Sequence, residues 1–243
     1  MLEGLVQRNV AKLVVGKPHA PQDRADAREH CWEAHEAKAF LTAAKAAGPQ
    51  PAAFYALALD TGMRKGELAG LRWSDLDLAG GRVKIERQLV KRGDPAPVFG
   101  PVKNKTPRTI EIAAEAVVLL RRHRAHPAEV KLHNGAAYTD HGLVFAKEPA
   151  DRRRHGMLGD PLQVNNIGDR EFRRLTQAAG VRRIKFHGMR HTCGTLLLQA
   201  GVPANVVQRR LGHKKIEITL GIYAHALPAM QQDAAAKLAA MLH

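Results

Sequence analysis

Five side chains suited to chemistry on a phosphate ester lie within the stretch from Phe186 to His225. They are His187, Arg190, His191, His213 and Tyr223. An arginine can hold a phosphate through two parallel hydrogen bonds, and an imidazole can donate hydrogen bonds or move a proton. A tyrosine oxygen becomes a nucleophile once its proton is removed. No cluster of carboxylates accompanies them, so the sequence predicts attack on a phosphodiester without a metal ion.

Helices must position these residues. The stretch from His187 to Gln199 has the length and leucine content of one helix, and His187 and Arg190, three residues apart, share one of its faces. Gly201 is the predicted end of that helix.

Two further short helices are predicted after this one. The first begins near Pro203 and ends at Gly212, which places His213 in the turn that follows. Ile216 and Tyr223 then recur at helical spacing on the second. A single histidine or a tyrosine at such spacing is more often a packing residue than a catalyst, but the combination of residues favours chemistry.

A further arginine lies far upstream, in the segment TGMRKGEL. Thr61 and Gly62 predict a turn, and Arg64 opens a short helix, where its charge adds to the free amides of the helix start. Glu67, three residues later, either orients the guanidinium or forms a surface ion pair. Taken alone, Arg64 would be interpreted as an ordinary solvated arginine. The hypothesis that it is functional rests on the candidate site residues downstream.

From Gly81 the apolar residues alternate, which predicts strands. Three strands are expected, in residues 81–87, 97–103 and 108–112, the last two joined by a turn that starts at Lys103. The turn holds Lys103 and Lys105 at the tip of a small antiparallel sheet, although a lysine at such a place is often only a soluble edge residue.

Helices account for most of the remaining chain. Tyr55 lies in an apolar helix and is expected in the core, and Leu143, Val144 and Phe145 are expected to be buried. The predicted fold class is therefore mainly α with a small antiparallel β-sheet (α+β). The remaining helices are expected at residues 33–47, 51–59, 113–126 and 166–179, with loops at 127–142 and 151–161.

The 243 residues include 38 basic and 23 acidic ones, so the formal net charge is +15 and the isoelectric point about 10.3. Such a charge predicts a polyanionic partner, with nucleic acid favoured because no apolar run approaches the length of a membrane span. Cys31 and Cys193 are far apart in the sequence, and two such cysteines do not predict a disulfide. A reducing cytoplasm is therefore the default expectation. His30, Cys31 and His35 lack the paired spacing of a zinc site and are expected on a polar surface, so no metal is assigned.

Four segments together resemble the tyrosine recombinases, the phage integrase family. They are TGMRKGEL around Arg64, VKNKTPRTIEI around Lys103, HGMRHT around His187, and LGHKKIEITLGIYAH ending after Tyr223. The resemblance covers residues 30–243 and implies the fold of the family's catalytic domain. One departure is Glu111, where the family usually has proline.

The resemblance also implies a domain organisation. Most members carry an N-terminal core-binding domain that clamps the other side of the DNA. Residues 1–29 would then be a remnant of that domain's last helix plus a linker, and residues 30–243 the catalytic domain. Its C-terminal tail helix, residues 229–243, would either pack on a neighbouring protomer and mediate self-association into a tetramer on double-stranded DNA, or fold back onto its own domain.

The implied reaction is cleavage and rejoining of DNA strands through a 3′-phosphotyrosyl intermediate, without metal, ATP or cofactor. Tyr223 would be the nucleophile, Arg64 and Arg190 would hold the scissile phosphate, His187 would be the acid-base partner, and His213 a further phosphate contact. The roles of the lysines follow from the hairpin.

Lys103 lies five residues before Arg108, which fits the family's usual hairpin, whereas from Lys105 the loop would be too short. Lys103 is therefore expected to protonate the leaving 5′-oxygen. Lys105 is expected to contact the DNA backbone, as are the phosphate-holding arginines.

Two other functions are compatible with parts of the sequence. A type IB topoisomerase shares the chemistry but reseals the original strand. A helix-turn-helix repressor could use the segment from Gly201 to Lys214, but it would not require Arg64, Lys103 and Tyr223.

Overall fold

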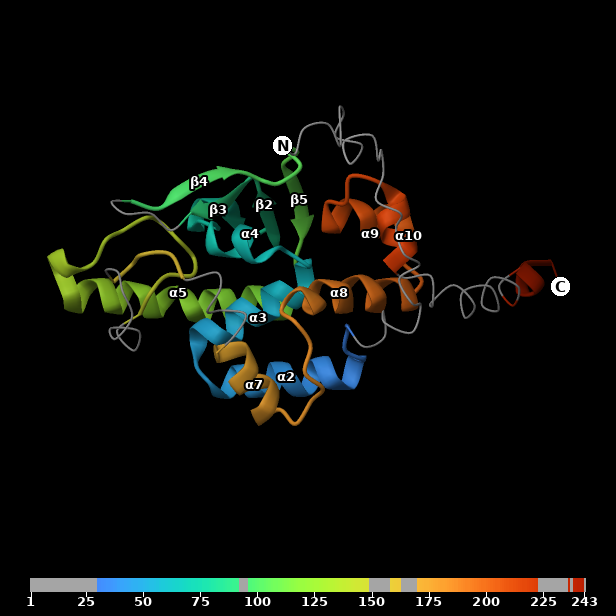
Figure 1. Cartoon of the computed structure of the whole chain (residues 1–243), viewed down its shortest axis with the longest axis horizontal. Helices are drawn as coiled ribbons and strands as arrows, with labels where there is room; N and C mark the ends of the chain where they lie inside the picture. The colour runs from blue at the N-terminus through green and yellow to red at the C-terminus, as the bar shows by residue number, and fades with distance from the viewer. Residues whose placement is uncertain are drawn as a thin grey trace, which may run out of the picture.

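The computed structural model describes residues 30–91, 96–148, 158–162, 170–222, 236 and 238–242. These residues form a mainly helical domain with short antiparallel strands, which confirms the predicted fold class (Figure 1). The helices are α2 (Ala34–Ala46), α3 (Pro49–Thr61), α4 (Lys65–Ala69), α5 (Ala114–Asn134), α7 (Phe172–Ala178), α8 (His187–Gln199), α9 (Ala204–Leu211) and α10 (Ile216–Ile222), with 3₁₀ turns η2 (Trp73–Asp75) and η3 (Gly135–Ala137). The strands are β1 (Leu76–Asp77), β2 (Arg82–Ile85), β3 (Arg87–Lys91), β4 (Val98–Pro101) and β5 (Arg108–Glu111).

Helix α3 forms the centre of the core because its sequence is apolar on almost every face. It packs against α2, α5 and α8, and Figure 1 shows α2 and α7 on one side of it and the strands with α4 on the other. Tyr55 of α3 is fully buried, as predicted, in an aromatic cluster. The rings of that cluster belong to Trp32, Phe40, Phe54, Tyr55, Phe145, Phe172 and Phe186.

Helix α5 is longer than predicted. It was expected to end before Pro127 and give way to a loop, but the backbone remains helical to Asn134. Buried Val130, beyond the proline, attaches the last turns to the domain, and the Asn134 side-chain amide donates to the Val130 carbonyl (2.7 Å). Tertiary packing therefore outweighs the hydrogen bond that the proline cannot make.

The strand pairing also differs from the expectation of one small sheet. β2 pairs with β1 and β5, whereas β3 pairs with β4 in a separate two-stranded ribbon. Residues 97–103 therefore do not pair with residues 108–112, and the lysine turn is a connection between two sheets rather than the tip of one hairpin. The chain breaks its strand at Glu86, so Arg87 belongs to the ribbon and not to the preceding strand.

Several expectations lie outside the described residues. These are the helix and linker at residues 1–29, the loop at 151–157, the first residues of the helix expected at 166–179, Tyr223, and most of the tail at 229–243. Within the tail, residues 238–242 are helical, and the apolar side chains of Leu238, Met241 and Leu242 are exposed.

His123 is a buried histidine that makes the fold sensitive to acid. Its Nε2 atom lies 2.7 Å from the Val144 carbonyl oxygen, and its ring stacks on Phe145. Burial lowers the pKa of His123 from 6.5 to about 4. In the unfolded chain the histidine has its ordinary pKa of 6.5, so between pH 6.5 and pH 4 it is protonated in the unfolded chain but neutral in the folded one. The free energy of unfolding therefore falls as the pH falls from 6.5 toward 4.

We expect this single group to remove about 2 kcal/mol of the free energy of unfolding between about pH 7 and about pH 5. Urea denaturation of the wild type and of His123→Gln at both pH values measures the effect. The glutamine keeps a donor for the Val144 carbonyl but does not titrate, so its loss of stability should be smaller by that amount. An equal loss in both proteins would contradict the assignment.

Candidate functional site

Arg64 is held at the start of α4 by a buried carboxylate. Gly62 ends α3 in the left-handed conformation (φ 61°), which turns the chain so that Arg64 is the N-cap of α4. The Glu67 carboxylate is fully buried, and it accepts hydrogen bonds from Arg64 Nη1 (2.8 Å) and from the Arg64 backbone N–H (3.0 Å). Of the two alternatives for Glu67, the structure therefore supports the one in which it orients the guanidinium.

Helix α8 has the predicted bounds and places its two expected site residues near that turn. Arg190 is almost fully buried, and its Nη1 atom donates to the Gly62 carbonyl (2.8 Å), so it contacts the turn that carries Arg64. His187 is the first residue of α8, and its ring meets the edge of the His191 ring at 4.8 Å between centroids.

The turn between α9 and α10 places His213 next to the residue that Arg64 contacts. Gly212 ends α9 in the left-handed conformation, and its carbonyl accepts from Asn104 Nδ2 (2.8 Å) and from Arg64 Nη2 (3.4 Å). The His213 Nδ1 atom lies 2.8 Å from the hydroxyl of buried Thr219 on α10. These contacts fix the position of the His213 ring.

The lysine loop connects β4 with β5. Asn104 ties it to Gly212, and Lys105 takes the left-handed conformation (φ 54°), with its N–H bonded to the Val102 carbonyl (2.7 Å). Both lysine side chains are exposed. Lys103 lies near enough to His187 to lower the pKa of that histidine.

Burial and positive charge keep the histidines of this site neutral. Partial desolvation lowers the pKa of His187, and Arg190, Arg64, Lys65 and Lys103 lower it further. Burial, with Arg190 and Arg64, lowers the pKa of His213 to about 3. At neutral pH the site therefore combines neutral imidazoles, which can accept a proton, with guanidinium and ammonium groups, which can hold an anion.

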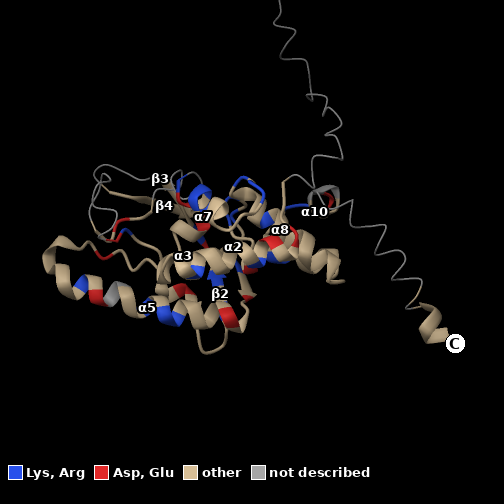
Figure 2. Cartoon of the chain, turned by 90° about the horizontal axis from the view of Figure 1, so that it is seen from below, with Lys and Arg blue, Asp and Glu red and all other residues tan. Residues whose placement is uncertain are grey.

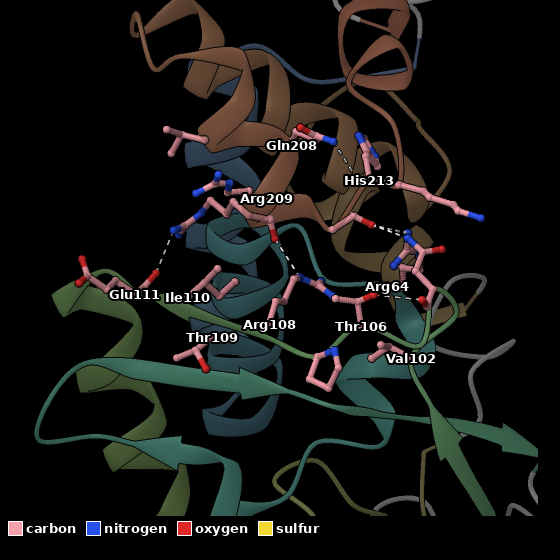
Figure 3. A pocket seen from close by; sticks show the side chains of 16 residues that line it. Arg64, Val102, Thr106, Arg108, Thr109, Ile110, Glu111, Gln208, Arg209 and His213 are labelled. Atoms are coloured by element: carbon pink, nitrogen blue, oxygen red, sulfur yellow. Dashed lines mark hydrogen bonds between the residues drawn. The ribbon is translucent and has the colours of Figure 1, made fainter.

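A hollow of about 770 Å³ opens beside these residues, between β5 and α9 (Figure 3). Arg64 and His213 lie at one end of it, Gly212 also lines it, and Arg209 and Arg210 come from α9. Its lining includes five basic side chains and one acidic side chain, a balance that suits an anionic ligand: Arg64, Arg108, Arg209, Arg210 and Lys214 against Glu111.

Exposed basic residues also occur outside the hollow. Arg173 and Arg174 on α7 are exposed, as are Arg182, Arg183 and Lys185 in the segment that leads to α8. Figure 2 shows that lysine and arginine occur on several elements, α5 and α7 among them.

Metal ligands do not gather among the described residues, where no group of three or more histidine, cysteine or acidic side chains could hold an ion. Cys31, which was expected on a polar surface, is instead buried. In the same part of the chain, no helix is both long and apolar enough to cross a membrane.

The structure brings together Arg64, Lys103, His187, Arg190 and His213, and Tyr223 lies one residue beyond the end of α10, outside the described residues. Sequence reasoning missed Arg108 and Asn104, which contact the same site. Arg108 could have been found from the alternation with Ile110 and Ile112, which predicts that its side chain points inward.

The fold is that of the catalytic domain of tyrosine recombinases. The chain belongs to the phage integrase family, whose model matches residues 31–230. Members of this family are enzymes that break and rejoin DNA.

Two curated relatives are similar over almost the whole chain. One is the tyrosine recombinase XerC-like protein of Caldanaerobacter subterraneus subsp. tengcongensis, 31% identical over 96% of this chain and 60% of its own length. The other is an integrase of Streptomyces ambofaciens, 28% identical over 96% of this chain and 58% of its own length. The chain therefore spans about 60% of the length of these relatives.

Solved structures agree on the fold. The XerA recombinase matches with a TM-score of 0.64 and 25% identity over 84% of this chain and 64% of its own. The catalytic domain of bacteriophage HP1 integrase matches with a TM-score of 0.53 and 18% identity over 85% of this chain and 93% of its own.

Proposed function

We propose that the chain is the catalytic part of a site-specific DNA recombinase that cleaves and rejoins strands through a 3′-phosphotyrosyl intermediate. The observation that carries the proposal is the convergence of Arg64, Arg190, His187, His213 and Lys103 from α4, α8, the lysine loop and the turn before α10. The net charge of +15 and solved relatives described in complex with DNA support double-stranded DNA as the partner.

In the proposed reaction, the Tyr223 oxygen bonds to the scissile phosphorus and the bond to the 5′-oxygen breaks. His187, neutral at pH 7 because its pKa is lowered, accepts the tyrosine proton. Lys103 gives a proton to the departing 5′-oxygen. The reverse steps with a different 5′-hydroxyl join new strands without ATP, because the phosphotyrosyl bond conserves the phosphoester.

Arg64 and Arg190 hold the non-bridging oxygens, where negative charge grows in the transition state. One such donor typically contributes about 3 to 4 kcal/mol. His213, whose ring is fixed by Thr219, adds a further hydrogen bond to the phosphate.

The test uses nicked duplexes from candidate flanking DNA, in which cleavage releases a short strand and traps the covalent adduct. A denaturation-resistant protein–DNA adduct with a free 5′-hydroxyl is the expected result. Exchange of strands between two marked duplexes then distinguishes a recombinase from a topoisomerase, which would reseal only the original strand. Binding without any adduct would instead indicate a repressor.

Lys103 rather than Lys105 is proposed as the proton donor. Lys103 acts on the pKa of His187, whereas Lys105 lies in the left-handed turn of the loop. A substrate whose scissile 5′-oxygen is replaced by sulfur has a leaving group that needs little protonation. We expect this substrate to restore cleavage by Lys103→Ala to near the wild-type rate.

The matched control is Lys105→Ala, whose weaker binding the sulfur should not repair. Single-turnover cleavage of both substrates by both variants measures the difference. Rescue of Lys105→Ala but not of Lys103→Ala would move the role to Lys105.

The tail at 229–243 is proposed to dock on a neighbouring protomer in a tetramer on DNA. Met230, Ala234, Leu238 and Met241 recur at helical spacing, and the side chains of Leu238 and Met241 are exposed. Deleting residues 229–243 should therefore reduce the formation of paired DNA complexes in native gels much more than the cleavage of a nicked duplex. Paired complexes at the wild-type level would show that the tail is not needed for them.

A further inference from the structure

Arg108 is a nearly buried arginine close to, but not part of, the proposed phosphate-binding group. It begins β5, directly after the lysine loop, and its side chain is 10% exposed. The alternation of the strand turns it to the same side as buried Ile110. A cation at such a position needs a specific electrostatic reason to be there.

Its hydrogen bonds join three elements of the site. Arg108 Nη2 and Nη1 donate to the two carboxylate oxygens of Glu67 on α4 (2.8 and 3.2 Å). Its Nε donates to the Arg210 carbonyl in the last turn of α9 (3.0 Å). The guanidinium also packs against Gly212, where an added Cβ would lie 3.1 Å from Arg108 Nη1.

Glu67 is therefore shared by two arginines. Each of its oxygens accepts one hydrogen bond from Arg108 and one from Arg64, through the Arg64 side chain or its backbone N–H. Burial raises the pKa of the Glu67 carboxyl, but the bonds from Arg108 and Arg64 outweigh burial, and the pKa lies below its usual value. The bidentate bond from Arg108 fixes the plane of the carboxylate, and that plane directs the bond to Arg64.

Gly212 is a second residue that both Arg64 and Arg108 contact. Its carbonyl accepts from Arg64 and from Asn104 of the lysine loop, while Arg108 packs on the same residue. The Arg108 side chain thus contacts Glu67, which bonds to Arg64. It also contacts Gly212, which bonds to the lysine loop and directly precedes His213.

We propose that Arg108 is a positioning residue that acts through Glu67 and Gly212 to hold the Arg64 guanidinium against the scissile phosphate. The inference rests on the proposed function, because it assigns Arg108 a part in the same reaction. Arg108 does not itself contact the DNA phosphate in this proposal.

The test variant is Arg108→Lys, which keeps the positive charge beside Glu67 but cannot bond to both of its oxygens and to the Arg210 carbonyl at once. The rate of single-turnover cleavage at saturating DNA should fall about 10²-fold, as expected for a misplaced catalytic group. DNA affinity should change less than about threefold, because the exposed basic residues remain. Arg82→Lys, an exposed arginine on neighbouring β2, is the matched control and should cleave at the wild-type rate.

A second substrate separates positioning from a general structural defect. A methylphosphonate replaces one charged non-bridging oxygen with a neutral methyl group, so an arginine is needed less at that oxygen. The diastereomer that restores cleavage by Arg64→Ala should restore Arg108→Lys to a similar degree. If it restores only Arg64→Ala, or neither variant, Arg108 does not act through the charge of Arg64 and the proposal fails.

A measurement without cleavage keeps the two proposals distinguishable. In ¹⁵N NMR spectra of the wild-type chain, the Arg64 guanidinium protons bonded to Glu67 should exchange slowly with water, and in Arg108→Lys they should exchange at least tenfold faster, as local opening exposes them. Unchanged exchange would overturn the role of Arg108. If the wild-type chain forms no adduct with DNA, the proposed function fails, and this measurement still decides whether Arg108 positions Arg64.

Discussion

Replacing Tyr223 with phenylalanine is expected to abolish the covalent protein–DNA adduct while DNA binding stays within about threefold of the wild type. In the proposed reaction the phenolic oxygen is the atom that bonds to phosphorus, so without it the reaction should slow by roughly 10⁴-fold or more. Incubation with the nicked duplex, followed by denaturing electrophoresis, measures the adduct. The phenylalanine keeps the ring, so the substitution removes only the phenolic oxygen.

The matched control is Tyr138→Phe, the same substitution at a tyrosine that follows η3. This variant should form the adduct at the wild-type rate. Adduct formation by Tyr223→Phe at more than a few per cent of that rate would reject the assignment of the nucleophile.

Replacing Arg190 with lysine is expected to lower the cleavage rate by about 10²- to 10³-fold, the usual effect of losing one donor to a developing anion. Lysine keeps the charge but lacks the planar fork that donates to the Gly62 carbonyl and, in the proposed reaction, also to a phosphate oxygen. The measurement is the single-turnover rate of adduct formation at saturating DNA, with circular dichroism at the same temperature to confirm that the variant is folded.

Arg183→Lys serves as the control, because Arg183 is exposed in the segment before α8. Its cleavage rate should match that of the wild type. A folded Arg190→Lys that cleaves within threefold of the wild type would mean that the guanidinium fork is not used in the reaction.

Much of the helical framework could be predicted from the sequence, because local signals and packing agree there. The bounds of α8 are those predicted, and Gly62 and Gly212 occupy the left-handed positions that end α3 and α9. The burial of Tyr55 and Phe145 follows from apolar segments with no competing signal.

The parts that could not be predicted depend on contacts between distant segments. The alternation in residues 81–112 indicates strands but does not say which strands pair, so the lysine turn was assigned to one hairpin instead of to a link between two sheets. The continuation of α5 past Pro127 depends on tertiary packing, which local propensity does not contain. The sharing of Glu67 by Arg64 and Arg108 joins residues 41 positions apart, and only the three-dimensional fold reveals it.

The lowered pKa values of His187 and His213 have a consequence for how binding responds to pH. Both are lowered in part by Arg190 and Arg64, so a bound phosphate, which offsets those charges, should raise them. Formation of the DNA complex would then take up protons from solution, and by thermodynamic linkage the affinity for DNA would increase as the medium becomes more acidic. Arg64 and Arg190, which are proposed to hold the phosphate, would in this way also couple DNA binding to proton uptake.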